Sequence, residues 1–167
     1  SAQPLGPGAR PTVTDPAAIL RAADAVILGF DGTLTTLWPP SRASEIVQDL
    51  ARLAGDERER PDGLTPAGLL RELADHPSVQ QLRVELNRYE SAAAHTARPE
   101  PLSVDLVREL SDRRLGLAVV TDHAADAADT FLMYAGLDRT LRGGAHGRSA
   151  DLARLMPHPD VLHRALR

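Results

Sequence analysis

Two short apolar runs separated by a long helical stretch dominate the hydrophobic pattern of the chain. Residues 25–30 read Ala-Val-Ile-Leu-Gly-Phe and are followed by Asp31-Gly32-Thr33, which predicts a buried parallel strand that stops at a tight turn. Residues 117–121 form a second such run, between helical patterns at 102–114 and 124–134. Strands that alternate with helices in this way favour an α/β fold built on a parallel sheet.

Between the two predicted strands, residues 41–97 carry only helical signals. Apolar residues recur there at helical spacing in three groups, which the charged segment 55–63 and Pro77 separate. The three groups are Ile46, Leu50 and Leu53; Leu69, Leu70 and Leu73; and Val79, Leu82, Val84, Leu86 and Tyr89. We therefore expect three or four helices inserted into the α/β core.

The borders of this insert and the two ends of the chain follow from local signals. The stiff segment Arg98-Pro99-Glu100-Pro101 marks the return to the core, because consecutive X-Pro steps exclude helix. We expect a core of residues 16–38 and 100–167, an insert of residues 39–99, and a flexible leader at residues 1–15. Helices are predicted at 15–23 and 161–167, and the glycine-rich segment 142–148 is predicted to be a loop, with a third strand as the alternative.

Composition narrows the range of partners and chemistry. The net charge of −4, without a basic cluster, argues against a nucleic-acid partner. All 19 basic residues are Arg, so a catalytic Lys is excluded, and the absence of Cys excludes disulfides and thiolate metal sites. Since no apolar run approaches the roughly 20 residues of a membrane span, we expect no membrane partner and a cytoplasmic protein.

The run Val26 to Leu34 resembles the first motif of the haloacid dehalogenase-like (HAD) hydrolase superfamily, an apolar strand followed by Asp-x-Asp-Gly-Thr-Leu. In that superfamily the first Asp attacks phosphorus and ligates Mg²⁺, while the second is a general acid/base whose backbone carbonyl also reaches the metal. The resemblance places Gly29 at the nucleophile position and Asp31 at the acid/base position. Because Gly has no side chain, we expect turnover to fall by about 10⁴ to 10⁶.

Residues 117–122 are similar to the second motif of the superfamily, an apolar strand that ends in a phosphate-binding Thr or Ser. The resemblance implies a phosphate site made by Gly32, Thr121 and Asp122. A Thr at this position is also typical of a helix N-cap, which is the alternative role for Thr121.

The third motif contains a Lys directly before Pro-x-Pro, and the similar segment here is Met156-Pro157-His158-Pro159. A thioether carries no charge, so Met156 cannot hold a phosphate electrostatically. Arg148 and Arg154 are the candidate replacements. No segment resembles the fourth motif, which completes the Mg²⁺ site, so the resemblance is to a degenerate or truncated member. With Asp31 as the one remaining carboxylate, we expect Mg²⁺ binding to be weak or absent.

Two further residue types complete the prediction. None of the six histidines has the spacing of a metal cluster, so His76, His95, His123, His146, His158 and His163 are expected at the surface. Trp38 is expected at the junction of the core and the insert, which the resemblance identifies as a helical cap.

Three functions are compatible with these observations. The first is a HAD-like pseudophosphatase that binds a phosphorylated ligand or a protein partner. The second is an active phosphohydrolase whose catalytic residues are substituted or lie outside this sequence. The third is a structural or interaction module. In addition, the strand at residues 26–30 is expected to expose an unpaired edge, which favours a homo-oligomer or a protein partner.

Overall fold

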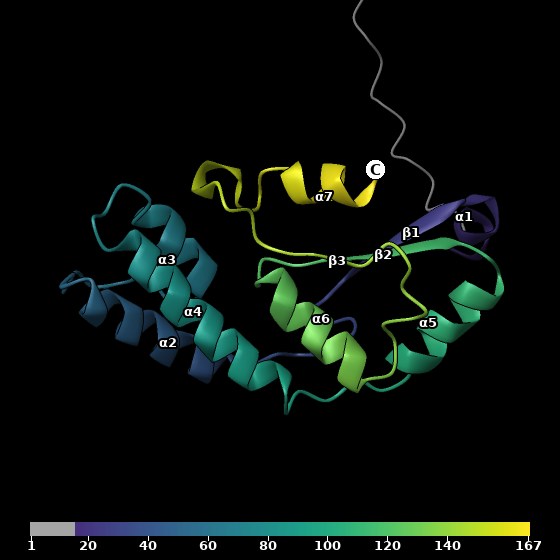
Figure 1. The fold of residues 1–167 in the computed structure, drawn as a ribbon, viewed down its shortest axis with the longest axis horizontal. Helices are drawn as coiled ribbons and strands as arrows, with labels where there is room; N and C mark the ends of the chain where they lie inside the picture. The colour runs from purple at the N-terminus through teal and green to yellow at the C-terminus, as the bar shows by residue number, and fades with distance from the viewer. Residues whose placement is uncertain (1–15) are drawn as a thin grey trace, which may run out of the picture.

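The computed structural model describes residues 16–167, which form an α/β fold around a three-stranded parallel sheet (Figure 1). The strands are β1 (Ala25–Gly29), β2 (Gly116–Val120) and β3 (Ala145–His146), in the spatial order β1-β2-β3. The helices are α1 (Pro16–Ala22), α2 (Pro40–Leu53), α3 (Pro66–Glu72), α4 (Val79–Ala94), α5 (Ser103–Asp112), α6 (Ala125–Tyr134) and α7 (Asp160–Ala165), with a 3₁₀ turn at Leu152–Arg154. The predicted fold class is therefore confirmed. The expected leader, residues 1–15, lies outside the described residues.

The two strands predicted from apolar runs form the centre of the sheet. β1 and β2 pair in parallel from Ala25 with Gly116 to Gly29 with Val120. The third strand has only two residues, in the segment predicted first as a loop. A side chain at Gly143 would lie 2.6 Å from the carbonyl oxygen of Leu117, so only glycine lets this segment approach β2. Close backbone contact, rather than apolar content, creates the third strand.

Helices lie on both faces of the sheet. Figure 1 shows α5 and α6 on one side and α7 on the other, while α2, α3 and α4 extend beyond the ends of β1 and β2. The core beneath the sheet is built mainly from aliphatic residues with two phenylalanines, Phe30 and Phe131, whose rings meet edge to face at 5.3 Å. This packing fixes the end of β1, where the predicted motif begins.

The insert has a hydrophobic cluster of its own, between α2, α3 and α4. Most of the apolar positions of the helical pattern are buried in it, although Val84 is 61% exposed and Leu53 is 42% exposed. Leu152 and Leu155, from the 3₁₀ region, also join this cluster. Trp38 packs against both clusters, which confirms its predicted place at the junction of core and insert.

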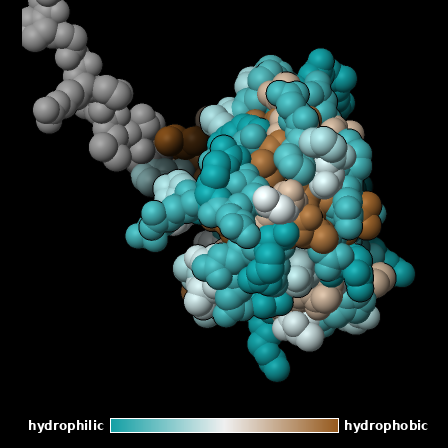
Figure 2. Space-filling model, turned by 90° about the vertical axis from the view of Figure 1, so that its left-hand side faces the viewer, coloured by the Kyte–Doolittle hydropathy of each residue, from teal (hydrophilic) through white to brown (hydrophobic). Residues whose placement is uncertain are grey.

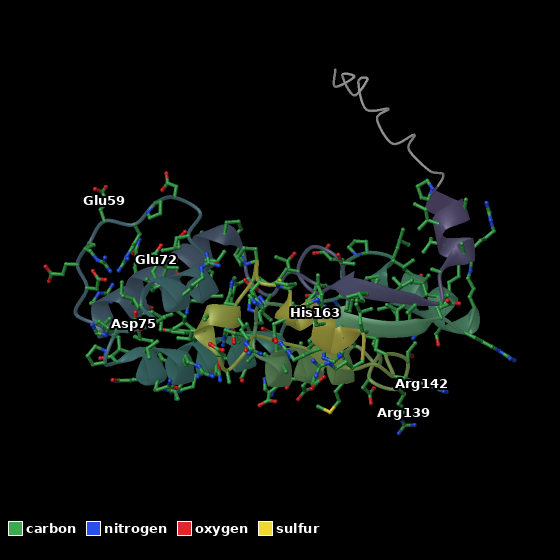
Figure 3. All side chains as sticks on the ribbon, turned by 90° about the horizontal axis from the view of Figure 1, so that it is seen from above. Glu59, Glu72, Asp75, Arg139, Arg142 and His163 are labelled. Atoms are coloured by element: carbon green, nitrogen blue, oxygen red, sulfur yellow. The ribbon has the colours of Figure 1, made fainter. Side chains whose placement is uncertain are left out.

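The face of the molecule at the end of the insert is mainly polar. Figure 2 shows the insert end, where hydrophilic side chains dominate and hydrophobic ones appear in gaps between them. Figure 3 shows acidic Glu59, Glu72 and Asp75 at this end, whereas Arg139 and Arg142 project at the opposite end. Within residues 16–167, no helix combines the length and the apolarity needed to cross a membrane.

Candidate functional site

The loops that follow β1 and β2 meet where the sheet faces the insert. After β1 the chain turns at once, with the amide of Gly32 donating to Thr35 and the amide of Leu34 donating to Phe30. Gly32 has a φ of +72°, a left-handed conformation that glycine adopts without strain. The turn directs the Asp31 side chain toward the loop after β2, and its Oδ1 accepts a hydrogen bond from the Leu37 amide at 3.1 Å.

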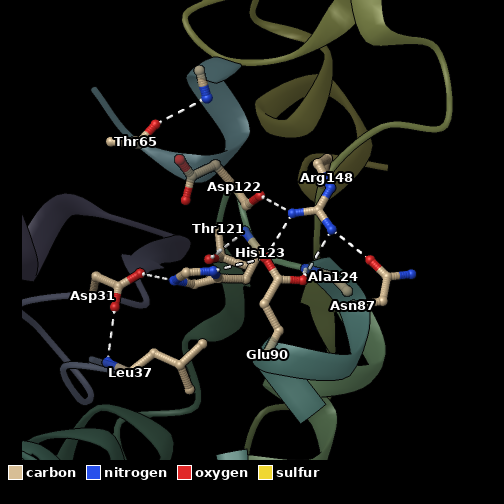
Figure 4. A network of polar contacts seen from close by, with 11 residues as sticks. Asp31, Leu37, Thr65, Asn87, Glu90, Thr121, Asp122, His123, Ala124 and Arg148 are labelled. Atoms are coloured by element: carbon tan, nitrogen blue, oxygen red, sulfur yellow. Dashed lines mark hydrogen bonds and ion pairs between the residues drawn. The ribbon is translucent and has the colours of Figure 1, made fainter. Parts of the chain in front are cut away.

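His123 lies at the centre of this site, in the loop between β2 and α6 (Figure 4). Its Nε2 is 2.7 Å from Asp31 Oδ2, and its Nδ1 is 3.0 Å from Glu90 Oε1. The imidazole is held edge-on against the rings of Phe30 and Trp38, and its backbone amide donates to the Thr121 hydroxyl. The ring is therefore fixed by contacts on its edges and through its backbone.

Glu90 reaches this site from α4 of the insert, with only 1% of its surface exposed. Its carboxylate accepts from His123, from the backbone amide of Ala124 and from both terminal nitrogens of Arg148. Arg148 follows β3, and its backbone amide donates to the carbonyl of His123 at 2.7 Å. A side chain at Gly147 would collide with Ala125, so glycine at this position lets the chain bring Arg148 into the site.

Each charged group in this network stabilises the ionised form of its neighbours. Burial opposes a charge on His123, but the carboxylates of Asp31 and Glu90 outweigh it and raise the pKa of His123 to about 9. Burial likewise opposes ionisation of Glu90, yet hydrogen bonds from His123 and Arg148 lower the pKa of that carboxyl. For Asp31, burial is outweighed by the bond from His123, and its pKa is also lowered. At neutral pH the site holds two cations and two anions in alternation.

A cavity of about 480 Å³ opens beside this network, between the core and the insert. Its base is polar, with Asp31, Glu90, Asp122 and His123, and its walls include Trp38 and the insert residues Ala43, Leu64, Pro66 and Ala67. The volume is within the range of small-molecule sites, which commonly combine apolar walls with a few polar groups.

Solved structures of two haloacid dehalogenase-like proteins are among those that resemble this fold. A haloacid dehalogenase-like family hydrolase from Streptococcus pneumoniae aligns over 87% of this chain and 70% of its own, with a TM-score of 0.57 and 18% identity. The chain has a haloacid dehalogenase-like fold. A HAD family hydrolase from Deinococcus radiodurans R1, with bound phosphate and sodium, aligns over 86% of this chain and 66% of its own, with a TM-score of 0.50 and 21% identity. No family profile and no curated protein matches the sequence.

The residues that the HAD resemblance singles out lie near the network, but not all are free to act. Gly29 ends β1, and Asp31 pairs with His123. Thr121 is buried, with its hydroxyl oxygen accepting from the His123 amide. The amide of Gly32 donates within its own turn and so offers no hydrogen bond to a phosphate. Asp122 lines the cavity.

The prediction for the histidines is wrong for His123, which is 8% exposed and lies at the centre of the polar network. Of the two arginines considered as replacements for the missing Lys, Arg148 lies in the network, whereas Arg154 contacts Asp151 and Asp160. Met156, at the position of the Lys, is 38% exposed. The cation next to Asp31 is therefore His123, which directly follows the Thr121-Asp122 pair in the sequence.

The carboxylates and the imidazole beside the cavity are the groups that could bind the Mg²⁺ that the HAD resemblance implies. Asp31, Asp122 and His123 bring one ligand atom each within 4.8 Å of one another. However, both oxygens of Asp31 already have partners, His123 is a cation, and Gly29 supplies no carboxylate. Since Mg²⁺ requires near-octahedral oxygen coordination, these residues do not fit a tight Mg²⁺ site.

Proposed function

We propose that this chain is a HAD-like pseudophosphatase, which binds a small phosphorylated ligand in the cleft between core and insert and does not hydrolyse it. In this proposal residues 39–99 act as a cap over the cleft. The cavity beside His123 supports ligand binding, since it has a suitable volume and a polar base. The phosphate described for the Deinococcus radiodurans R1 protein supports a phosphorylated ligand.

The lack of a carboxylate at position 29, together with the paired state of Asp31 and His123, is the observation that carries the proposal. Position 29 has no side chain, and the nearby Asp31 is hydrogen-bonded on both oxygens. Both ring nitrogens of His123 face carboxylates, so neither has a lone pair with which to attack phosphorus or accept a proton. Asp31 and His123 are thus already occupied, and Asp122 is the remaining carboxylate that lines the cavity.

We expect the affinity for phosphate alone to be low. Asp31 and Asp122 face the same cleft as the cation His123, and repulsion between like charges offsets part of the attraction. A dissociation constant on the order of 1 mM or above is the expectation for inorganic phosphate. A phosphorylated ligand that also fills the apolar walls would bind more tightly, because it removes apolar surface from water.

Two measurements on the same protein test the proposal. Trp38 is the single Trp of the chain and lines the cleft, so its fluorescence reports a titration with inorganic phosphate or phenyl phosphate. Hydrolysis of p-nitrophenyl phosphate with added Mg²⁺ is followed in parallel. We expect saturable binding and no enzyme-dependent hydrolysis. Robust hydrolysis would instead identify an active phosphohydrolase.

A pair of Thr variants locates the binding. Thr121→Val removes the hydroxyl that orders the His123 loop and that the HAD resemblance assigns to phosphate. Thr130→Val, on the exposed side of α6, is the matched control, because its hydroxyl bonds only the Asp126 carbonyl. Weaker binding in Thr121→Val alone supports the proposal, whereas superimposable titrations of all three proteins contradict it.

A further inference from the structure

Glu90 is held in the way that a bound anion is held. Its two oxygens accept four hydrogen bonds, at 2.7 and 2.9 Å from Arg148, 3.0 Å from His123 and 3.0 Å from the amide of Ala124. Two of these donors are cationic, and the Arg148 contact is bidentate, the geometry that recognises carboxylates and phosphates. The amide belongs to Ala124, the N-cap residue directly before α6.

The donors and the acceptor come from different parts of the chain. His123, Ala124 and Arg148 follow the core strands β2 and β3, whereas Glu90 projects from α4 of the insert. The donors also have contacts that do not depend on Glu90. Asp31 still pairs with His123, while Asn87 and the Asp122 carbonyl accept from Arg148. The core thus forms a cradle for an oxyanion, and the insert fills it.

A purely stabilising role does not fully explain why Glu90 is paired with His123 and Arg148 at this place in the fold. A buried pair commonly adds little net stability, because the loss of hydration offsets the attraction. Glu90 is also one of the residues that line the cavity, so a ligand in the cleft would lie beside it. The place where a strand ends and the next helix begins is where open α/β sheets bind anionic ligands.

We propose that the Glu90 carboxylate is an internal anion that occupies the oxyanion site of the cleft, so that a carboxylate or phosphate ligand binds by displacing it from His123, Ala124 and Arg148. The displacement by a phosphorylated ligand rests on the function proposed above; the existence of the cradle does not. The formal charges of Asp31, His123, Glu90 and Arg148 cancel. Removal of Glu90 leaves these four contacts with one positive charge in excess, which Asp122, on the same cavity, offsets in part.

Chemical rescue tests the cradle. Glu90→Ala removes the atoms that acetate can replace, so acetate should stabilise this variant more than NaCl at equal ionic strength. With a dissociation constant on the order of 10 mM, about 100 mM acetate raises the ratio of folded to unfolded protein roughly tenfold. Glu85→Ala is the matched control, since Glu85 is on the same helix and pairs with the exposed Arg88. Equal effects of acetate on Glu90→Ala, Glu85→Ala and the wild type would overturn the proposal.

A second variant keeps the test decisive if Glu90→Ala does not fold. Glu90→Gln keeps the side-chain volume and an acceptor for the Ala124 amide, but its neutral amide is displaced more easily. By Trp38 fluorescence, we expect inorganic phosphate to bind Glu90→Gln about tenfold or more tightly than the wild type, because a like charge is removed. Affinity unchanged or reduced in Glu90→Gln would show that Glu90 does not compete with the anion.

The two proposals fail in different ways. If acetate rescues Glu90→Ala but no protein binds phosphate, the cradle is real and the phosphorylated ligand is wrong. If the wild type binds phosphate while acetate fails to rescue Glu90→Ala and Glu90→Gln gains no affinity, the ligand proposal stands and the internal-anion proposal is wrong.

Discussion

The replacement of Arg148 by Met is expected to destabilise the protein strongly. The Arg148 side chain is 4% exposed and its terminal nitrogens make four hydrogen bonds, two of them to the 1% exposed Glu90. The methionine has a similar length and no charge, so it fills the space but leaves the Glu90 carboxylate with less compensation. Breaking a buried pair from one side costs about 3–5 kcal/mol.

The other contacts of Glu90 decide how much unfolding free energy Arg148→Met should lose. His123 and the Ala124 amide still donate to Glu90, so we expect the low end, about 3 kcal/mol. For a chain of this size, that corresponds to a decrease in Tm of roughly 6–12 °C. The matched control is Arg113→Met. The side chain of Arg113 is 50% exposed, and that of its partner Glu109 is 64% exposed. Its expected cost is below about 1 kcal/mol.

Urea denaturation followed by circular dichroism measures both variants, and a double variant isolates the cause. If charge left unpaired is the source of the loss, Glu90→Gln combined with Arg148→Met should be more stable than Arg148→Met alone. The reasoning is refuted if Arg148→Met loses less than about 1 kcal/mol of stability. It is also refuted if Glu90→Gln lowers the stability of Arg148→Met by as much as it lowers that of the wild type.

Three other outcomes follow from the structure. Gly29→Asp should fold, because a Cβ there meets only the Thr33 hydroxyl at 3.4 Å, yet it should not hydrolyse p-nitrophenyl phosphate, since Asp31 remains paired with His123. The raised pKa of His123 means that its stabilising charge is complete below pH 6.5 and lost as the pH rises to about 9; urea midpoints of the wild type should fall across this window, and those of His123→Gln should not show this fall. The edge of β1 has no strand partner within residues 16–167, and light scattering should show association at high concentration that Ile27→Pro reduces; a wild type that stays monomeric at all concentrations contradicts this.

The elements that the sequence predicted well are those encoded locally. The runs at β1 and β2 are apolar over consecutive residues. The strands end at Gly29 and Val120, each one residue before the end of the predicted run. The helices of the insert follow from apolar spacing in the same way. β3 was harder to predict, because its two residues depend on the close approach that Gly143 permits rather than on their own side chains.

The network could not be read from local pattern, because its members are distant in sequence. Glu90 is 33 residues from His123 and 58 from Arg148. One signal was nevertheless present: Glu90 falls on the buried stripe of α4 with Leu82, Leu86 and Ala94, four residues apart. An acidic residue on an otherwise apolar stripe needs a buried partner, and that requirement predicts a cation from elsewhere in the chain.

The same balance of charges bears on Gly29, which the HAD resemblance places at the nucleophile position. Asp31, which resembles a general acid/base, is neutralised by His123, and the excess charge of His123 and Arg148 is in turn balanced by Glu90. Each ionised group thus keeps its charge because its neighbour does, as the lowered pKa values of both carboxyls and the raised pKa of the imidazole indicate. A single substitution toward the HAD motif therefore adds one group to a site whose other charges are already committed, and recovery of chemistry would first require that Asp31 be released from His123.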